Sequence, residues 1–143
     1  MNRYLLDTHA VIGLLTGNDE RLPGNIRDDI ESFRYRCYVS AASLIEMTDK
    51  QQKKNEIIVP GNVDEWIRLL DERAIDVLDI TSDIVRRFDK EGIPESQTLK
   101  HKDPFDRLII ATALVHNMTL ISADRKFPWW QRYRKLSLLY LGE

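Results

Sequence analysis

Short apolar runs alternate along the chain with longer segments in which apolar residues recur three or four positions apart. The short runs predict buried strands, and the periodic segments predict helices. The expected strands are 4–6, 37–39, 75–80, 119–121 and 138–141, with a short extended piece at 57–59. The expected helices are 8–15, a surface helix bearing Ile26, Ile30 and Phe33, a helix capped by Ser40 that reaches Lys53, 63–70, 82–90 and a helix that begins at Pro104.

The order of these elements predicts an α/β fold. Strands separated by helix-sized segments indicate βαβ crossovers, hence a three-layer α/β/α sandwich around a mostly parallel sheet of four to five strands. A chain of 143 residues can bury one ordinary core, and no repeat or low-complexity segment divides it. We therefore expect residues 1–143 to form a single domain.

The helix that begins at Pro104 has a well-specified start. Asp103 suits the N-cap, Pro104 the first helical position, and Asp106 the third, near the positive end of the helix dipole. Capping alone would explain both aspartates. Asp106, however, shares a helix face with the apolar Ile110 and Ala113, and a buried carboxylate costs free energy unless it is paired or bound to a cation.

Three further acids are expected at the same edge of the sheet. Asp7 and Asp124 follow expected strands, and Glu46 lies in the second turn of a helix that follows a strand. The carboxyl ends of parallel strands meet at one edge, where ligands collect in open α/β sheets. Each acid alone could be a cap or a solvated residue, but four at one edge favour a shared site.

Four converging carboxylates need cations, because two such charges about 4 Å apart repel by up to roughly 4 kcal/mol at an effective dielectric constant of 20. Ligands that offer only oxygen favour Mg²⁺ or Mn²⁺ over zinc. One or two such ions could polarise a phosphodiester and orient an attacking water. The sequence therefore predicts phosphodiester hydrolysis, with these catalytic and metal-binding residues: Asp7, Glu46, Asp106 and Asp124.

Composition limits the partners and the cellular compartment expected for this protein. The formal net charge of −2 provides no overall basic field, so a polyanion would have to be held by local patches or by bound metal. The single cysteine, Cys37, lies in an apolar run, which leaves no disulfide or zinc pattern and fits a reducing compartment. No apolar stretch reaches the length of a membrane span. We expect a cytoplasmic protein without a membrane partner.

Four motifs in order carry a family resemblance. They are Leu5–His9, Ser40–Glu46, His101–Arg107 and Leu120–Asp124. From Tyr4 to about Leu141 the chain resembles the PIN-domain ribonucleases, which include the VapC-type toxins of bacterial toxin-antitoxin pairs.

The resemblance implies a metal-dependent endoribonuclease that cleaves single-stranded or structured RNA. It assigns the metal site to the four acids, with Asp7 and Asp106 as the first choices for direct ligands. It also implies a homodimer, and inhibition by a small antitoxin whose C-terminal segment can place a basic residue in the acidic pocket. Two features depart from the family pattern: Ser122 stands where threonine is commoner but keeps a hydroxyl, and the loop around 95–98 is longer than usual.

Several nearby residues are accessory candidates. Thr8 follows Asp7 in the first motif, and Ser122 precedes Asp124 in the last. Asp103 could contact metal or water, although capping is the favoured interpretation. His101 could shuttle a proton or contact phosphate, or only hydrogen-bond within its loop. Arg107 could pair with one of the acids or touch phosphate.

Basic and aromatic residues mingle between positions 125 and 135. This composition suits neutralisation of an RNA backbone together with base stacking, but the same aromatics could pin a loop to the core, which is slightly favoured. The RNA-binding candidates here are Arg125, Lys126, Trp129 and Trp130. Three lysines could guide RNA or form the solvated face of their helix: Lys50, Lys53 and Lys54.

Two alternative functions remain open at this point. A phosphotransferase with an aspartyl nucleophile at Asp7 would need a second acid two residues on, where His9 stands. A catalytically silent PIN-fold protein could instead act only as an RNA-binding or protein-interaction module. Alanine at Asp7 or Asp106 would separate an enzyme from such a module, because only the enzyme would lose metal-dependent cleavage.

Overall fold

The computed structural model describes residues 2–54, 58–91, 103–128, 131 and 136–142. The sheet has the strand order β3-β2-β1-β4-β5, and all four neighbouring pairs are parallel. Its strands are β1 (Arg3–Leu6), β2 (Arg36–Ser40), β3 (Asp76–Leu78), β4 (Thr119–Ser122) and β5 (Leu138–Tyr140). The expected parallel α/β fold is therefore confirmed.

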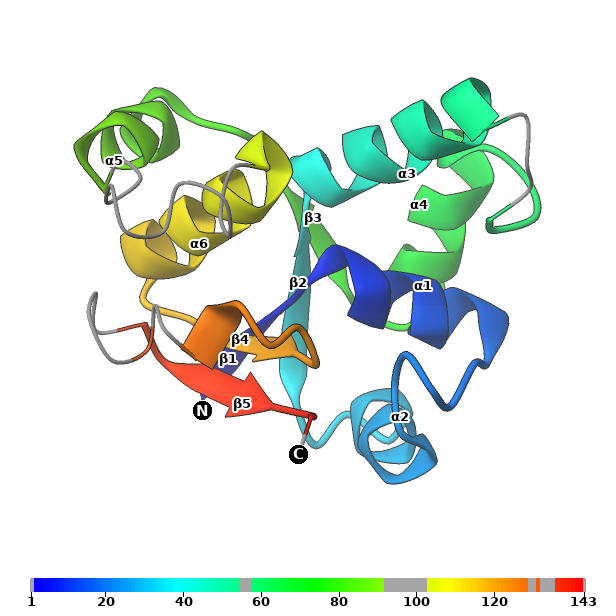
Figure 1. Ribbon diagram of the computed structural model, residues 1–143. Coiled ribbons are helices and arrows are strands. Elements are labelled where there is room, and N and C mark those ends of the chain that lie inside the picture. Colours follow the sequence, from blue (N-terminus) through cyan, green and yellow to red (C-terminus); the bar gives the residue numbers. More distant parts are fainter. Residues whose placement is uncertain (1, 55–57, 92–102, 129–130, 132–135, 143) are drawn as a thin grey trace.

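Helices cover both faces of this sheet (Figure 1). They are α1 (Thr8–Thr16), α2 (Gly24–Glu31), α3 (Ala41–Lys54), α4 (Val63–Glu72), α5 (Ser82–Glu91) and α6 (Pro104–His116). In the view of Figure 1, α5 and α6 lie on one side of the central strands, and α1 and α4 on the other.

Successive side chains of the central strand point to opposite faces, as strand geometry requires. Leu5 packs with Ile109 and Ile110 of α6, whereas Leu6 packs with residues of α1, α3 and α4. Both leucines are completely buried. One strand thus contributes to two hydrophobic clusters, which makes the fold three-layered.

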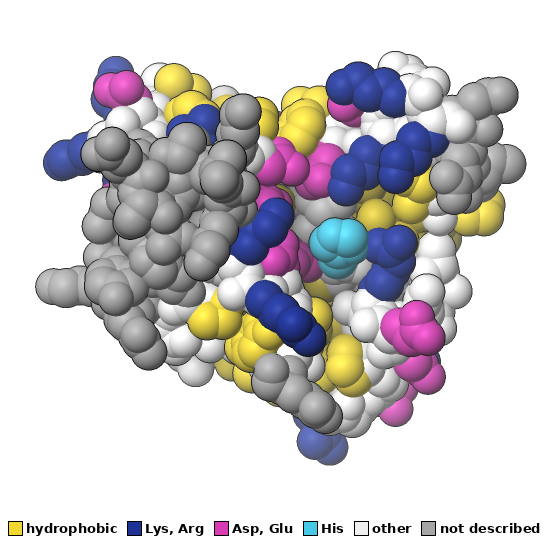
Figure 2. Space-filling view, in the orientation of Figure 1, with side chains coloured by type: hydrophobic (Ala, Val, Ile, Leu, Met, Phe, Trp, Pro, Cys, Tyr) yellow, Lys and Arg dark blue, Asp and Glu magenta, His cyan; other side chains and the backbone are white. Residues whose placement is uncertain are grey.

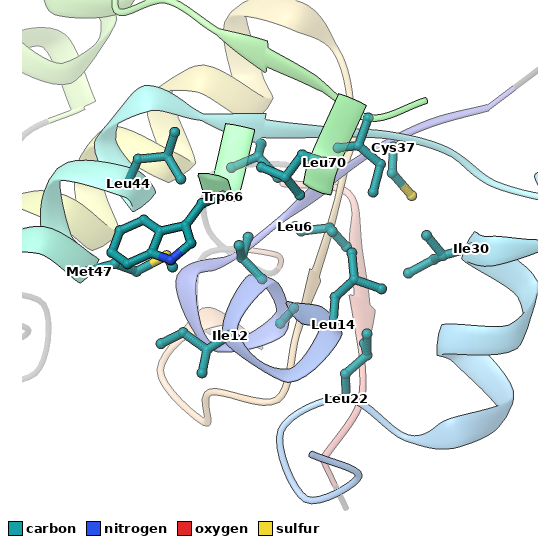
Figure 3. Packing of buried hydrophobic residues seen from close by; sticks show 14 of the residues in the cluster. Leu6, Ile12, Leu14, Leu22, Ile30, Cys37, Leu44, Met47, Trp66 and Leu70 are labelled. Carbon is teal, nitrogen blue, oxygen red and sulfur yellow. The ribbon is translucent and has the colours of Figure 1, made fainter. Parts of the chain in front are cut away.

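The larger of the two clusters contains a buried aromatic side chain beside α3 (Figure 3). Trp66 of α4 is 1% exposed and packs in the same cluster as Leu44 and Met47 of α3. Its indole Nε1 donates a hydrogen bond of 3.0 Å to the carbonyl oxygen of Pro60, so the buried polar atom is satisfied.

Two expected elements differ in the structure. The helix expected to carry Phe33 ends at Glu31, and Phe33 has a φ of 63° and is 62% exposed. The left-handed backbone at Phe33 ends the helix, and the backbone N–H of Arg34 donates to the carbonyl oxygen of Asp29 at 2.9 Å. No strand forms at the described part of 57–59, because the backbone N–H groups of Ile58 and Val59 both donate to Oε1 of Gln51, at 2.8 Å. Residue 57 lies outside the described residues.

The lengths of the helices show whether any of them could span a membrane. Among the helices in the described residues, none combines the length and the apolar character that spanning a lipid bilayer requires.

Candidate active site

The acidic residues lie at the carboxyl edge of the sheet. Asp7 directly follows β1, and Asp124 follows the end of β4 by two residues. Glu46 lies on α3, the helix that follows β2, and Asp106 lies in the first turn of α6, which contacts α3. The topology therefore brings together acids from distant parts of the chain.

Asp7 is a buried carboxylate, 3% exposed, that also caps a helix. Its Oδ1 accepts a hydrogen bond of 2.7 Å from the backbone N–H of Ala10, and its Oδ2 accepts one from the Ser122 hydroxyl. Burial raises the pKa of Asp7 to about 6 against the opposing effect of these two hydrogen bonds, and the negative charges of Asp124 and Glu46 raise it further.

Asp106 carries the larger perturbation. Burial raises its pKa to about 7, and the negative charges of Asp103, Asp124 and Glu46 act in the same direction, while Lys126 opposes them. Within the described part of the chain, no group donates a hydrogen bond to the Asp106 carboxylate. A partly buried carboxylate without a donor, beside other acids, has the environment expected of a cation ligand.

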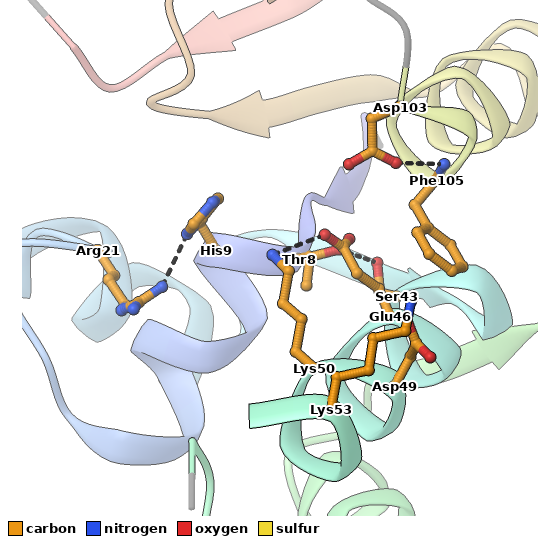
Figure 4. A network of polar contacts seen from close by, with 10 residues as sticks. All are labelled: Thr8, His9, Arg21, Ser43, Glu46, Asp49, Lys50, Lys53, Asp103 and Phe105. Carbon is orange, nitrogen blue, oxygen red and sulfur yellow. Dashed lines mark hydrogen bonds and ion pairs between the residues drawn. The ribbon is translucent and has the colours of Figure 1, made fainter. Parts of the chain in front are cut away.

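Glu46 is held by groups of the protein itself (Figure 4). It is 4% exposed, and its Oε1 accepts a hydrogen bond of 2.6 Å from the Thr8 hydroxyl. The Ser43 hydroxyl lies 3.1 Å from that of Thr8. The Nζ atom of Lys50 lies 2.9 Å from the other oxygen, Oε2. Lys50 was expected to guide RNA or to be solvated; the i, i+4 spacing with Glu46 is the signal that could have indicated the pair.

A serine links two of the acids. The Ser122 hydroxyl donates to Asp7 and accepts a hydrogen bond of 3.0 Å from the backbone N–H of Asp124. Oδ1 of Asp124 in turn accepts from the backbone N–H of Lys126 at 2.9 Å. The hydroxyl at this position therefore orients one carboxylate and fixes the backbone that carries another.

The chemistry of the donor set fits a hard divalent cation, because the ligands at this edge are carboxylate oxygens, and burial together with the charges of Asp124 and Glu46 raises the pKa values of Asp7 and Asp106. In the described part of the chain, however, no three side chains of Asp, Glu, His or Cys already form a group that could hold an ion. Asp7 and Glu46 are engaged by protein donors instead. Binding an ion would require these side chains to reorient.

The remaining accessory candidates have different environments in the structure. Asp103 caps α6, with its Oδ1 accepting from the N–H of Phe105 at 2.8 Å, as the favoured interpretation had it. The Arg107 guanidinium lies 4.2 Å from the ring centroid of Phe88 and forms no ion pair with a described acid. Arg125 and Lys126 are exposed. Three candidates lie outside the described residues: His101, Trp129 and Trp130.

A small pocket lies next to the acids, and the sequence analysis did not predict it. It has a volume of about 250 Å³ and is lined by His9, Glu20, Arg21, Ala123 and Asp124. Nη1 of Arg21 lies 2.7 Å from Nδ1 of His9. Partial burial and the positive charges of Arg21 and Lys50 lower the pKa of His9. Figure 2 shows a histidine at the surface between basic side chains and a group of acidic ones.

Comparison with solved structures finds the same fold in toxin-antitoxin complexes. VapBC2 from Rickettsia felis, bound to a DNA fragment from its promoter, matches with a TM-score of 0.62 and 18% identity over 96% of this chain and 97% of that chain. DNA-bound VapBC from Salmonella typhimurium matches with a TM-score of 0.64 and 16% identity over 98% of each chain. VapBC-1 from nontypeable Haemophilus influenzae matches with a TM-score of 0.57 and 24% identity over 96% of each.

The curated proteins include no match to this chain. The comparison with protein families matches residues 4–131 to the PIN domain, and this range contains all four clustered acids. The chain therefore belongs to the PIN domain family.

Proposed function

We propose that this single-domain chain is a Mg²⁺- or Mn²⁺-dependent endoribonuclease and the toxin of a toxin-antitoxin pair. The observation that carries the proposal is that two carboxylates far apart in the sequence, Asp7 and Asp106, both experience the negative charges of Asp124 and Glu46 and have pKa values raised to about 6 and about 7. Membership of the PIN domain family and the likeness to VapBC structures support it. The proposed substrate is single-stranded or structured RNA.

Each acid has a distinct part in the proposed reaction. Asp7, oriented by Ser122 and Ala10, and Asp106, which has no described donor, are the direct ligands for one or two ions. Asp124 and Glu46 complete the negative site. A bound divalent ion supplies positive charge at the scissile phosphate. Asp124 and Glu46 would orient the attacking water and accept its proton.

The proposed partners are a small antitoxin and a second copy of this chain, in the cytoplasm. An apolar groove of about 480 Å³ between α3 and α4 supports a protein contact, and two of its lining residues, Ile45 and Ile67, are 51% and 40% exposed. The acidic centre would accept a basic side chain of the antitoxin in place of metal.

The proposal is tested by expressing the wild type beside Asp106→Asn and sequencing RNA ends. We expect new ends with the wild type and none above background with the variant, because the amide cannot replace the anionic ligand. Asp64→Asn is a matched control, since Asp64 is an exposed aspartate in the first turn of α4. It should cleave like the wild type.

The same three purified proteins should be assayed on RNA with Mg²⁺, Mn²⁺ or a chelator, after their melting temperatures have been compared. Cleavage by a folded Asp106→Asn protein, or cleavage by the wild type in chelator, would contradict the proposal. Growth inhibition that survives Asp106→Asn would favour the binding module without turnover.

A further inference from the structure

A small pocket shares Asp124 with the acidic centre. Besides Asp124 and Ala123, its lining residues are His9 from the first turn of α1, and Glu20 and Arg21 from the loop between α1 and α2. Its volume of about 250 Å³ lies below the range of about 300 to 1,000 Å³ typical of drug-sized ligands. The pocket is therefore large enough for a single nucleobase but small for a drug-sized ligand.

The loop that carries Glu20 and Arg21 is fixed by local contacts. Leu22 is completely buried, and its backbone N–H donates to the carbonyl oxygen of Asn18 at 3.0 Å. Oδ1 of Asn18 accepts from the backbone N–H of Glu20 at 2.9 Å. The two pocket-lining side chains therefore start from an ordered backbone.

Arg21 keeps most of its hydrogen-bonding capacity. Among the described residues its guanidinium forms one hydrogen bond, to the His9 ring, and no ion pair, whereas Arg27 pairs with Asp19 at 2.8 Å. Since an arginine side chain only donates, Nδ1 of His9 is the acceptor. Figure 4 shows this contact between Arg21 and His9. The neutral ring then carries its proton on Nε2, which adds a second donor at the pocket.

The lining combines donors with acceptors. Arg21 and His9 donate, whereas Glu20 and Asp124 present carboxylate oxygens that only accept when ionised. A phosphate in this pocket would meet two negative side chains, so the lining does not suit an anion. A neutral group that offers donors and acceptors side by side fits better, and an unpaired RNA base has this property.

We propose that this pocket is a subsite for a guanine base of the RNA strand, beside the scissile phosphate; the inference rests on the proposed ribonuclease function. The guanine N1–H and N2–H groups are adjacent donors that match the two oxygens of Glu20. O6 and N7 are the acceptors that arginine recognises in guanine, and they match Arg21. The His9 ring supplies an aromatic face for stacking. Glu20, Arg21 and His9 are thus specificity-determining residues.

The test uses uridine-rich oligoribonucleotides with one guanosine, inosine, adenosine or cytidine placed at each position in turn. Binding to the Asp106→Asn protein is measured by fluorescence anisotropy, and cleavage by the wild type is measured on the same set. We expect guanosine at one position beside the cut to be preferred over adenosine by about tenfold or more. Inosine, which lacks the 2-amino group, should fall between them.

Variants of the pocket-lining residues then test whether the base preference arises in this pocket. Glu20→Gln should remove the discrimination between guanosine and inosine, because the amide offers only one acceptor. Arg21→Ala should remove most of the preference over adenosine. The matched controls are Glu72→Gln and Arg68→Ala, which alter an exposed ion pair on α4 and should leave base preference unchanged.

The outcomes separate the two proposals. Failure of the wild type to cleave both cellular RNA and every oligonucleotide with Mn²⁺ would overturn the ribonuclease function. Cleavage without base preference, or a guanosine preference unchanged in both Glu20→Gln and Arg21→Ala, would overturn the subsite alone. The comparison of guanosine with inosine on the wild type needs no protein variant, so equal cleavage of the two would overturn the subsite even if a variant fails to fold.

Discussion

The Nζ atom of Lys50 lies 2.9 Å from Oε2 of Glu46, one helical turn away on α3. The side chain of Glu46 is only 6% exposed, and that of Lys50 is 34% exposed. A cation of the protein itself therefore already neutralises one acid of the proposed metal site. Asp7, Asp106 and Asp124 form no ion pair within the described residues, which makes them the more available ligands.

Replacing Lys50 with methionine should tighten the binding of Mn²⁺. The divalent ion would no longer compete with the ammonium group for Glu46, and a partly exposed pair worth about 1 kcal/mol corresponds to about fivefold in affinity. Isothermal titration calorimetry measures the change. Lys53→Met is the control, because Lys53 pairs with the partly exposed Asp49 at 3.0 Å with the same i, i+4 spacing. Equal affinities in both variants would exclude competition by Lys50.

The raised carboxylate pKa values predict how the stability of metal-free protein depends on pH. Since the pKa of Asp7 is about 6 and that of Asp106 about 7, against 3.8 ordinarily, the folded state holds more protons than the unfolded state between about pH 4 and pH 7. The contribution of these groups to the free energy of unfolding therefore falls as pH rises through that window.

Asp106→Asn should remove the contribution of Asp106 to this decrease in the free energy of unfolding. In chelator at pH 8 the variant should be more stable than the wild type by roughly 1 to 4 kcal/mol, since each pKa unit corresponds to about 1.4 kcal/mol. Near pH 4 the difference should be small. Urea unfolding followed by tryptophan fluorescence at several pH values provides the measurement. A difference that stays constant with pH would argue against a burial effect on this carboxylate.

Ser122→Ala should lower cleavage by about tenfold, because Asp7 loses the hydroxyl that orients it and the Asp124 backbone loses its acceptor. Ser122→Thr retains the hydroxyl and should keep most of the activity. Initial rates at saturating metal report the effect on orientation. Equal activity of the alanine and threonine variants would show that the hydroxyl has no part in the reaction.

Gly13→Ala should destabilise the fold by about 1 to 3 kcal/mol. A Cβ atom at Gly13 would lie 2.8 Å from both the Cβ and the backbone nitrogen of Leu22, a buried residue that cannot easily move. Gly24 is the matched control, because a Cβ there would meet its nearest atom at 3.7 Å. Gly24→Ala should leave the melting temperature close to that of the wild type, and a similar loss in both variants would refute the close approach.

The sequence by itself determined the elements of this protein and the edge where its acids lie. Apolar periodicity placed the strands and helices, and Asp103 and Pro104 marked the start of α6. Such signals are local: they depend on residues a few positions apart, which meet in any helix or strand. The prediction was wrong near Phe33, where a left-handed backbone conformation follows the end of α2.

Only the tertiary structure decided how the side chains at that edge pair with one another. The hydrogen bond between Ser122 and Asp7 spans 115 positions, and the contact between Arg21 and His9 depends on the course of a loop. No periodic sequence pattern indicates either contact, because each forms only after the sheet and its covering helices have packed. Packing also buries Asp106 and thereby raises its pKa. The free energy cost of ionising this carboxylate is therefore a property of the folded molecule.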